Sequence, residues 1–288
     1  MRPHGNSYLR SLLILGRVSN LPTVWSNCLA GWLLAGGGST AHFVQLTLGT
    51  TFLYLGGMFL NDAFDADFDR QNRPERPIPS GAIDVGEVWK WGSVWLILGV
   101  VCLSLLGLQS AILAFLLAIS ILLYDSIHKI FILSPVIMAA CRFLVILIAS
   151  SAATAGITGL SIWSALVLAA YIVGLSYMAR TESSPGPLRY WPLLFLAAPV
   201  ILAMTINRGD YLWRGIFLSA LLVVWIANCA RHAYAGTPHN VARMIGGLLA
   251  GIVLVDLLAV ASLTLPFALL FLSLFLLALA AQRFIPPT

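Results

Sequence analysis

The sequence has few charged residues for its length. Only 9% of its 288 residues are Asp, Glu, Lys or Arg, whereas 60% are hydrophobic. Soluble domains carry about 25% charged and about 45–50% apolar residues. The 16 basic and 11 acidic side chains are too few to cover a soluble protein of this length. The composition therefore excludes a cytosolic enzyme, a disordered protein and a secreted disulfide scaffold, and predicts that most of the surface faces lipid.

Cysteine is scarce as well. The four cysteines, Cys28, Cys102, Cys141 and Cys229, lie far apart within apolar runs and form neither a CxxC pair nor a Cys/His cluster. We interpret them as small core residues rather than metal ligands or disulfides. The polar start, MRPHGNSYLR, leads into an apolar segment without a clear small-residue cleavage site, which favours a first membrane helix over a removable signal peptide.

Ten apolar segments approach the length of about 20 residues that a helix needs to cross a bilayer. They span residues 18–36, 43–62, 91–107, 109–124, 134–155, 161–179, 189–206, 212–230, 244–263 and 266–282. Because neither an internal repeat nor a low-complexity linker divides the chain, we expect one domain over residues 1–288. The predicted fold class is an all-α integral membrane protein, a bundle of about nine to ten transmembrane helices.

The charges gather in alternate connections between these segments. The connections GGGSTAH, LQS, TAGITG and SLTLP carry none, whereas the opposite connections carry most of the Arg and Lys residues and nine of the eleven acidic ones. Positively charged loops lie on the cytoplasmic side of membrane proteins. We therefore expect both termini on that side, together with a polar chamber that faces the cytoplasm and contains the functional site.

The most informative segment is NDAFDADFDRQNRPERPIPSG, which begins at Asn61, directly after an apolar helix. If this helix continues for one or two turns, a rotation of about 100° per residue puts four side chains on one stripe. These are Asn61, Asp62, Asp65 and Asp69, whereas Asp67 points to the opposite side. Carboxylates this close repel each other unless a cation lies among them. Mg²⁺ suits such oxygen ligands and also accepts phosphate oxygens.

Three arginines follow the acidic stripe: Arg70, Arg73 and Arg76. The planar guanidinium group suits bidentate contacts with phosphate. The run PIPSG then ends the helix and forces a rigid turn. Carboxylates for a metal beside arginines for phosphate indicate a diphosphate site. The alternative is an interfacial charged loop whose Asp and Arg residues simply pair. Such a loop, however, requires neither acidic residues on one helix face nor a rigid proline-rich turn after them.

The pattern Asn61-Asp62-x-x-Asp65-x-x-x-Asp69, followed by Arg73 and by RPIPSG, resembles the first aspartate-rich motif of the UbiA-type intramembrane prenyltransferases. The predicted membrane bundle agrees with this family over the whole chain. The resemblance implies that Asn61, Asp65 and Asp69, with Asp62 beside them, hold Mg²⁺ that bridges an isoprenyl diphosphate. The phrases RVSNLPTVWSN and SYMARTES are similar to the EboC-like branch of the superfamily.

A second point of resemblance is the segment YDSIHK, in which Tyr124 and Lys129 match a Tyr and a Lys of the family. Lys129 would then be a point charge for the diphosphate, although an ordinary pair with Asp125, four residues away, explains it equally well. Arg17 and Asn20, at the mouth of the first span, match positions where the family has polar pocket residues.

The second aspartate-rich motif of the family, of DxxxD type, has no match. The corresponding region reads YMARTESS, with one arginine, Arg180, and one acid, Glu182. Either Arg180 neutralises phosphate in place of a second Mg²⁺, with Glu182 or Asp125 as a lone ligand, or the site does not ionise diphosphates in the usual way.

Two charged residues lie inside apolar spans, Arg142 and Asp256. Because a charge within the bilayer is costly, both should face the interior and find partners. Arg142 either binds phosphate in the chamber or is a structural partner of Asp256 or Asp125. His128 is interpreted as an interfacial residue rather than a ligand.

The sequence favours a membrane prenyltransferase that ionises an allylic isoprenyl diphosphate with Mg²⁺ and transfers the prenyl group to an aromatic or other electron-rich acceptor. Its expected partners are the diphosphate donor, a small-molecule acceptor and membrane lipid, without nucleic acid. We expect catalytic roles for Asp65, Asp69, Lys129 and Tyr124. Substrate-binding roles are expected for Arg17, Asn20, Arg70, Arg73, Arg76, Arg142, Arg180 and Glu182.

The main alternative is a transporter or binding protein for isoprenoid or other anionic lipids, which the missing second acidic pair favours. A secondary transporter, however, typically has repeat symmetry and polar residues at the midplane. A purely structural membrane subunit is a third possibility, but it does not explain carboxylates on one stripe.

Overall fold

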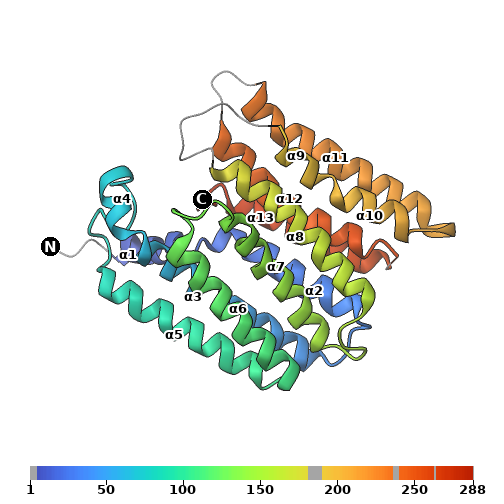
Figure 1. Cartoon of the computed structure of the whole chain (residues 1–288), viewed down its shortest axis with the longest axis horizontal. Helices are drawn as coiled ribbons and strands as arrows, with labels where there is room; N and C mark the ends of the chain where they lie inside the picture. The colour runs from blue at the N-terminus through green and yellow to red at the C-terminus, as the bar shows by residue number, and fades with distance from the viewer. Residues whose placement is uncertain (1–4, 181–189, 236–239, 263, 288) are drawn as a thin grey trace.

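The computed structural model describes residues 5–180, 190–235, 240–262 and 264–287, and these residues form helices without any strand (Figure 1). The elements of the first half are α1 (Gly5–Leu15), η1 (Val18–Asn20), α2 (Leu21–Leu34), α3 (Thr40–Phe64), α4 (Ala66–Asn72), α5 (Val85–Ser104), α6 (Leu108–Ile127) and α7 (Ser134–Ser151). The second half contains α8 (Gly159–Arg180), α9 (Pro192–Leu196), α10 (Ala198–Ile206), η2 (Gly209–Tyr211), α11 (Leu212–Tyr234), α12 (Val241–Ala259) and α13 (Leu265–Ala281). The predicted all-α class is confirmed.

Seven of the described helices are long and apolar enough to cross a membrane, namely α3, α5, α6, α7, α8, α11 and α12. The other three predicted spans fall on shorter elements. The first is α2, with 14 residues, and the last is α13, with 17. The segment predicted as 189–206 is broken into α9 and α10, and Pro199 lies in the first turn of α10, where a proline is tolerated.

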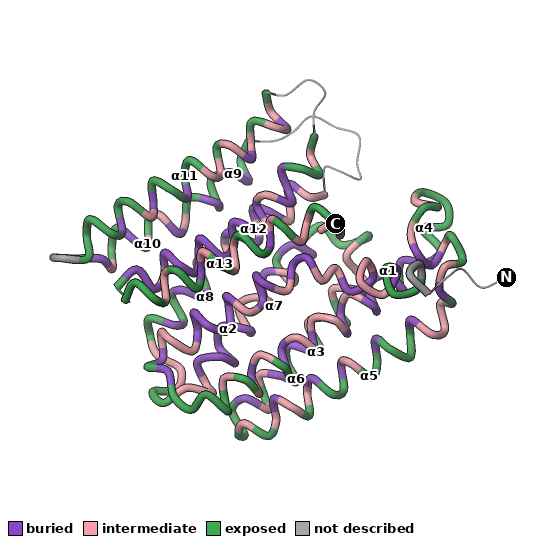
Figure 2. Tube along the Cα trace, turned by 180° about the vertical axis from the view of Figure 1, so that it is seen from behind, coloured by how far each residue is buried: buried purple, intermediate pink, exposed green. Residues whose placement is uncertain are grey.

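The helices differ in how far they are enclosed. Helix α12 lies in the middle of the bundle, and 72% of its most apolar stretch is buried. Helices α5 and α11 lie at opposite edges, and only 22% of the corresponding stretch of each is buried (Figures 1 and 2). The outward faces of these edge helices carry exposed large apolar side chains, among them Ile97, Phe217 and Val224. An apolar outer surface around a buried centre is what a lipid environment requires.

The packing of α3 against α5 is unusually close and depends on glycine. A Cβ added to Gly56 would lie 2.7 Å from the backbone nitrogen of Leu96, and one added to Gly99 would lie 2.8 Å from that of Leu53. Small residues let the backbones of membrane helices approach in this way. The contact holds the end of α3, which carries the acidic stripe, against its neighbour.

The acidic segment departs from one continuous helix. Helix α3 ends at Phe64, Asp65 occupies the junction, and α4 ends at Asn72 rather than at the proline-rich run. Arg73 follows with a non-helical backbone (φ −144°, ψ 63°), because the proline after it disfavours the α-helical region. The turn beyond it packs through the buried Ile78 and Ile83 onto a small apolar cluster with Phe59. This packing fixes the turn that follows Arg76, a residue that lines the chamber described below.

The glycine contact gives a first testable prediction. Gly99→Ala should lower the free energy of unfolding by about 1–3 kcal/mol, because the new methyl group overlaps the α3 backbone. Gly159→Ala is the matched control, since a Cβ there meets nothing within 4 Å. Thermal melting in detergent compares the two variants, and equal melting temperatures would contradict the close packing.

Candidate active site

A cavity of about 500 Å³ lies between α2, α3, α6, α7, α8 and α12 and reaches the segment that contains α4. We call it the chamber. One end is polar and is lined by Arg17, Asn20, Asn61, Asp65, Asp69, Arg73, Arg76, Asp125, His128, Lys129 and Arg180. Most of the remaining wall is apolar and includes Val24, Leu53, Leu117, Ile121, Val145, Ile172, Leu175, Leu249 and Ile252. The chamber therefore joins a charged end to an apolar interior.

The acidic stripe lies along one edge of the charged end. Asn61 on the last turn of α3, Asp65 at the junction and Asp69 on α4 are all buried and line the chamber. Asp67 faces the opposite way and its side chain is 92% exposed, as the helical spacing predicts. Asp62, the fourth member of the stripe, is also buried but is not part of the chamber wall. Three members of the stripe thus share one surface.

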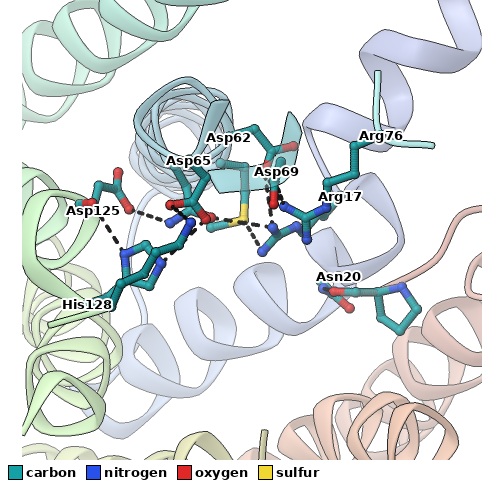
Figure 3. A network of polar contacts seen from close by, with 12 residues as sticks. Arg17, Asn20, Asp62, Asp65, Asp69, Arg76, Asp125 and His128 are labelled. Carbon is teal, nitrogen blue, oxygen red and sulfur yellow. Dashed lines mark hydrogen bonds and ion pairs between the residues drawn. The ribbon is translucent and has the colours of Figure 1, made fainter. Parts of the chain in front are cut away.

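Each carboxylate of the stripe is paired with a basic side chain from another segment (Figure 3). Asp62 Oδ1 lies 3.1 Å from Arg17 Nη2 and 3.4 Å from Arg76 Nη1, and Arg76 also lies 2.8 Å from Asp69 Oδ2. The sequence argument required a metal to relieve the repulsion between these acids. In the structure basic residues of the chain itself lie among these acids and balance the repulsion.

Asp65 is held from the end of α6. Its Oδ1 lies 2.7 Å from Lys129 Nζ and its Oδ2 lies 3.5 Å from His128 Nε2. Burial by itself raises the pKa of Asp65, but the hydrogen bonds and charges of His128 and Lys129 outweigh it and keep this pKa below its ordinary value. Asp65 is therefore an anion at neutral pH. Lys129 pairs with Asp65, whereas the sequence also allowed a pair with Asp125.

The end of α6 contributes two further residues: His128, which the sequence interpretation did not count as a ligand, and Asp125, which it left as a possible lone ligand. His128 lies in the chamber wall, and its ring stacks on Tyr124 at 5.0 Å between centroids. Asp125 accepts a hydrogen bond of 3.0 Å from Asn61 Nδ2, and its other oxygen has no partner among the described residues. Tyr124 and His128 are four residues apart and therefore lie on one helix face, so the spacing could have indicated that His128 lies in the chamber wall beside Tyr124.

Arg17 and Asn20 meet the chamber from the start of α2. Arg17 has a left-handed backbone (φ 39°, ψ 48°), which is rare for a residue with a side chain and is typical of functional positions. Its carbonyl oxygen accepts a 3.1 Å hydrogen bond from the hydroxyl group of Tyr54, a chamber residue that the sequence analysis missed. Asn20 Nδ2 donates to the carbonyl oxygen of Pro287 at 2.9 Å.

Three of the predicted substrate residues are placed differently. Arg70 is half exposed, pairs with Asp67 and does not line the chamber. Arg180 does line it, but its Nη1 donates to the carbonyl oxygens of Phe131 (2.9 Å) and Ile132 (3.1 Å), so it anchors the connection between α6 and α7. Glu182 lies outside the described residues.

The donor set of the stripe suits magnesium in its chemistry. Asn61, Asp65 and Asp69 offer only oxygen ligands on one wall, which Mg²⁺ prefers. Within the described part of the chain, however, no three Asp, Glu, His or Cys side chains converge closely enough to hold a metal ion. Metal binding at this wall therefore requires these side chains to move closer together.

Residues 22–183 match the UbiA prenyltransferase family. The chain belongs to this family. A digeranylgeranylglyceryl phosphate synthase from Haloquadratum walsbyi is 30% identical over 131 residues, which are 45% of this chain and 46% of that protein. A 4-hydroxybenzoate octaprenyltransferase from Paracidovorax citrulli is 38% identical over 74 residues, a quarter of each chain (25% and 25%). The matched parts thus cover less than half the length of these relatives.

Solved structures of UbiA homologues have the same fold. The apo structure of a homologue from Aeropyrum pernix has a TM-score of 0.67 at 17% identity and covers 84% of this chain and 96% of that one. A homologue from Archaeoglobus fulgidus, bound to GPP and Mg²⁺, has a TM-score of 0.63 at 16% identity and covers 96% and 99%. The predicted UbiA superfamily is confirmed, and the seven apolar helices fit a multi-pass integral membrane protein.

The pairing of Asp62 gives a second prediction. Asp62→Asn should destabilise this UbiA-family protein by on the order of 3 kcal/mol, because it leaves the largely buried Arg17, whose side chain is only 20% exposed, without its carboxylate. Asp67→Asn removes an equally acidic residue whose side chain is 92% exposed and should change stability by less than about 1 kcal/mol. Thermal unfolding in detergent at neutral pH compares them. A loss of the same size in both variants would show that the Asp62 pairs add no stability.

Proposed function

We propose that this protein is an intramembrane prenyltransferase, a single functional unit over residues 1–288. It ionises an allylic isoprenyl diphosphate with the help of Mg²⁺ and transfers the prenyl group to an electron-rich small molecule. The observation that carries the proposal is the chamber itself, in which a charged end continues into an apolar interior. Such a cavity matches a molecule with a diphosphate head and a hydrocarbon chain.

The charged end offers what a diphosphate needs. Arg73, Arg76 and Lys129 line it beside Asp65 and Asp69. Bound at Asn61, Asp65 and Asp69, Mg²⁺ would neutralise charge on the leaving diphosphate. We propose that Arg76 and Lys129 then exchange their carboxylate partners for phosphate oxygens, so that no charge is left unpaired. The homologue from Archaeoglobus fulgidus is bound to GPP and Mg²⁺, which supports a prenyl diphosphate and Mg²⁺ as the molecules that bind here.

The apolar interior suits the second half of the reaction. When the allylic C–O bond breaks, its electron pair leaves with the diphosphate and a carbocation remains on the prenyl chain. Side chains such as Leu117, Ile121 and Leu175 exclude the water that would capture this cation. Tyr124, which lines the chamber beside His128, offers an aromatic face near the charged end. The acceptor then attacks the cation and loses a proton.

The distribution of charge supports an orientation in the membrane. The charged end of the chamber lies among connections rich in Arg and Lys, and such connections face the cytoplasm. We therefore propose that the diphosphate enters from the cytoplasmic side. The prenyl chain and a lipid-soluble acceptor would reach the apolar interior from the surrounding lipid.

A third prediction tests the reaction. Asp65→Asn and Asp69→Asn should each lower Mg²⁺-dependent release of diphosphate from geranylgeranyl diphosphate by at least about 100-fold, because the charge on the leaving group is no longer balanced. Chelation of Mg²⁺ with EDTA should have the same effect on the unaltered protein. Asp67→Asn, whose side chain is 92% exposed on the opposite face, is the control and should keep full activity.

The same assay separates an enzyme from a lipid-binding protein. Release of radiolabelled diphosphate is followed alongside binding of the labelled prenyl chain to the purified protein. Tight binding without release in the unaltered protein, under all acceptors supplied, would overturn the enzymatic proposal and favour a binding protein or transporter for isoprenoid lipids. Unchanged release in both Asp variants would refute the assigned residue roles.

A further inference from the structure

One charged residue of the chamber lies apart from the cluster at the charged end. Arg142 is in the third turn of α7 and lines the chamber beside apolar side chains such as Val145. It is eight residues beyond Ser134, the first residue of α7, which Arg180 contacts at 3.1 Å. At 1.5 Å per residue this separation is about 12 Å along the helix. The chamber therefore has a second positive centre, deeper than the first.

Arg142 is held in a defined orientation by α2. Its Nη1 donates to Asn27 Oδ1 at 2.7 Å and its Nη2 donates to Thr23 Oγ1 at 3.1 Å. The amide nitrogen of Asn27, Nδ2, donates to Asp256 Oδ2 at 2.6 Å, and Ser26 Oγ donates to the same oxygen at 2.5 Å. Asn27 therefore connects the guanidinium of α7 to the carboxylate of α12. Because both ends of the amide are engaged, Arg142 is positioned in advance of any ligand.

This arrangement leaves most of the guanidinium available. Two of its five N–H groups are used by Asn27 and Thr23, and the structure places no further hydrogen bond on the rest within the described residues. Asp256 balances the charge only through the amide, since no direct ion pair joins it to Arg142 among those residues. A permanently charged group inside a membrane helix is costly and typically marks a functional site. Replacing buried charges of this kind by apolar residues is often neutral or stabilising, so stability by itself does not require Arg142 and Asp256.

We propose that Arg142 binds an anionic group of the prenyl acceptor, a carboxylate or a phosphate monoester. This inference rests on the proposed function, because it assigns the charged end of the chamber to the diphosphate of the donor and the deeper centre to the second substrate. The fork of N–H donors suits both anions. An acceptor held there presents its electron-rich group toward the charged end, where the allylic carbon would be released.

The proposal is tested by binding of matched probes to the full-length protein in detergent. One pair is 4-hydroxybenzoate and its methyl ester, and the other is an alkylglycerol phosphate and the uncharged alkylglycerol. Binding is measured with Mg²⁺, in the absence and in the presence of a thiolo analogue of geranylgeranyl diphosphate. We expect the unaltered protein to bind the anionic member of at least one pair about tenfold or more tightly than the neutral member.

The deciding variant is Arg142→Met combined with Asp256→Asn, which removes both buried charges and so leaves no unpaired carboxylate. It should lose the preference for the anion by about 10- to 100-fold while its affinity for the neutral probe stays the same. Arg208→Met, at an exposed position, is the control for the loss of one positive charge and should keep the preference. Melting temperatures establish that each variant is folded.

Three results would overturn the proposal. The unaltered protein could fail to prefer either anion, or the double variant could keep the preference. Alternatively, the double variant could lose affinity for the diphosphate analogue in parallel, which would place Arg142 in the donor site. Failure of the proposed function is seen separately, as the absence of Mg²⁺-dependent binding of the analogue to the unaltered protein, while the probe pairs measured without the analogue still report on Arg142.

Discussion

The charged end of the chamber depends on ion pairs between segments that are far apart in the chain. Arg17 precedes α2, Asp62 and Asp65 lie at the end of α3, Arg76 follows α4, and Lys129 follows α6. Their mutual contacts join these segments at one end of an apolar bundle. In surroundings of low polarity, such pairs hold their geometry, because separating them would leave charges without partners. The same ion pairs therefore position the site and hold this end of the bundle together.

These pairs also explain how acidic and basic groups can be concentrated in a membrane protein before a substrate arrives. Each carboxylate of the stripe is paired with an arginine or a lysine of the same chain. Under the proposed function, a divalent ion would give the carboxylates a new partner and a diphosphate would give the basic residues one. The close glycine contact holds α3, whose end carries the acidic stripe, against α5. The buried oxygen of Asp125 that lacks a partner adds a further acceptor to this wall.

The chamber is also asymmetric in a way that the first motif does not suggest. The region where the family has its second acidic pair contributes Arg180, which is engaged with the carbonyl oxygens that follow α6. Deeper inside, Arg142 is oriented by Asn27 and Thr23, and Asp256 lies behind the amide. One end of the chamber thus combines acids and bases, whereas the described wall of the interior sets Arg142 among apolar side chains. Two different anionic groups, on two substrates, are consistent with this division.

The sequence by itself determined the features that depend on composition and local spacing. The shortage of charge predicted lipid-facing helices, and the rotation per residue placed Asn61, Asp65 and Asp69 on one face with Asp67 opposite. Such inferences succeed because helical geometry is set within a few residues. Helix ends were less certain: α4 stops at Asn72, and the segment predicted as 189–206 is divided near Pro199. The partners of each charge were decided only by the tertiary structure. Arg17 meets Asp62 across 45 residues, Asn27 meets Asp256 across 229, and Asn20 meets Pro287 across 267. Contacts of this kind arise from how whole helices pack, which no local pattern records.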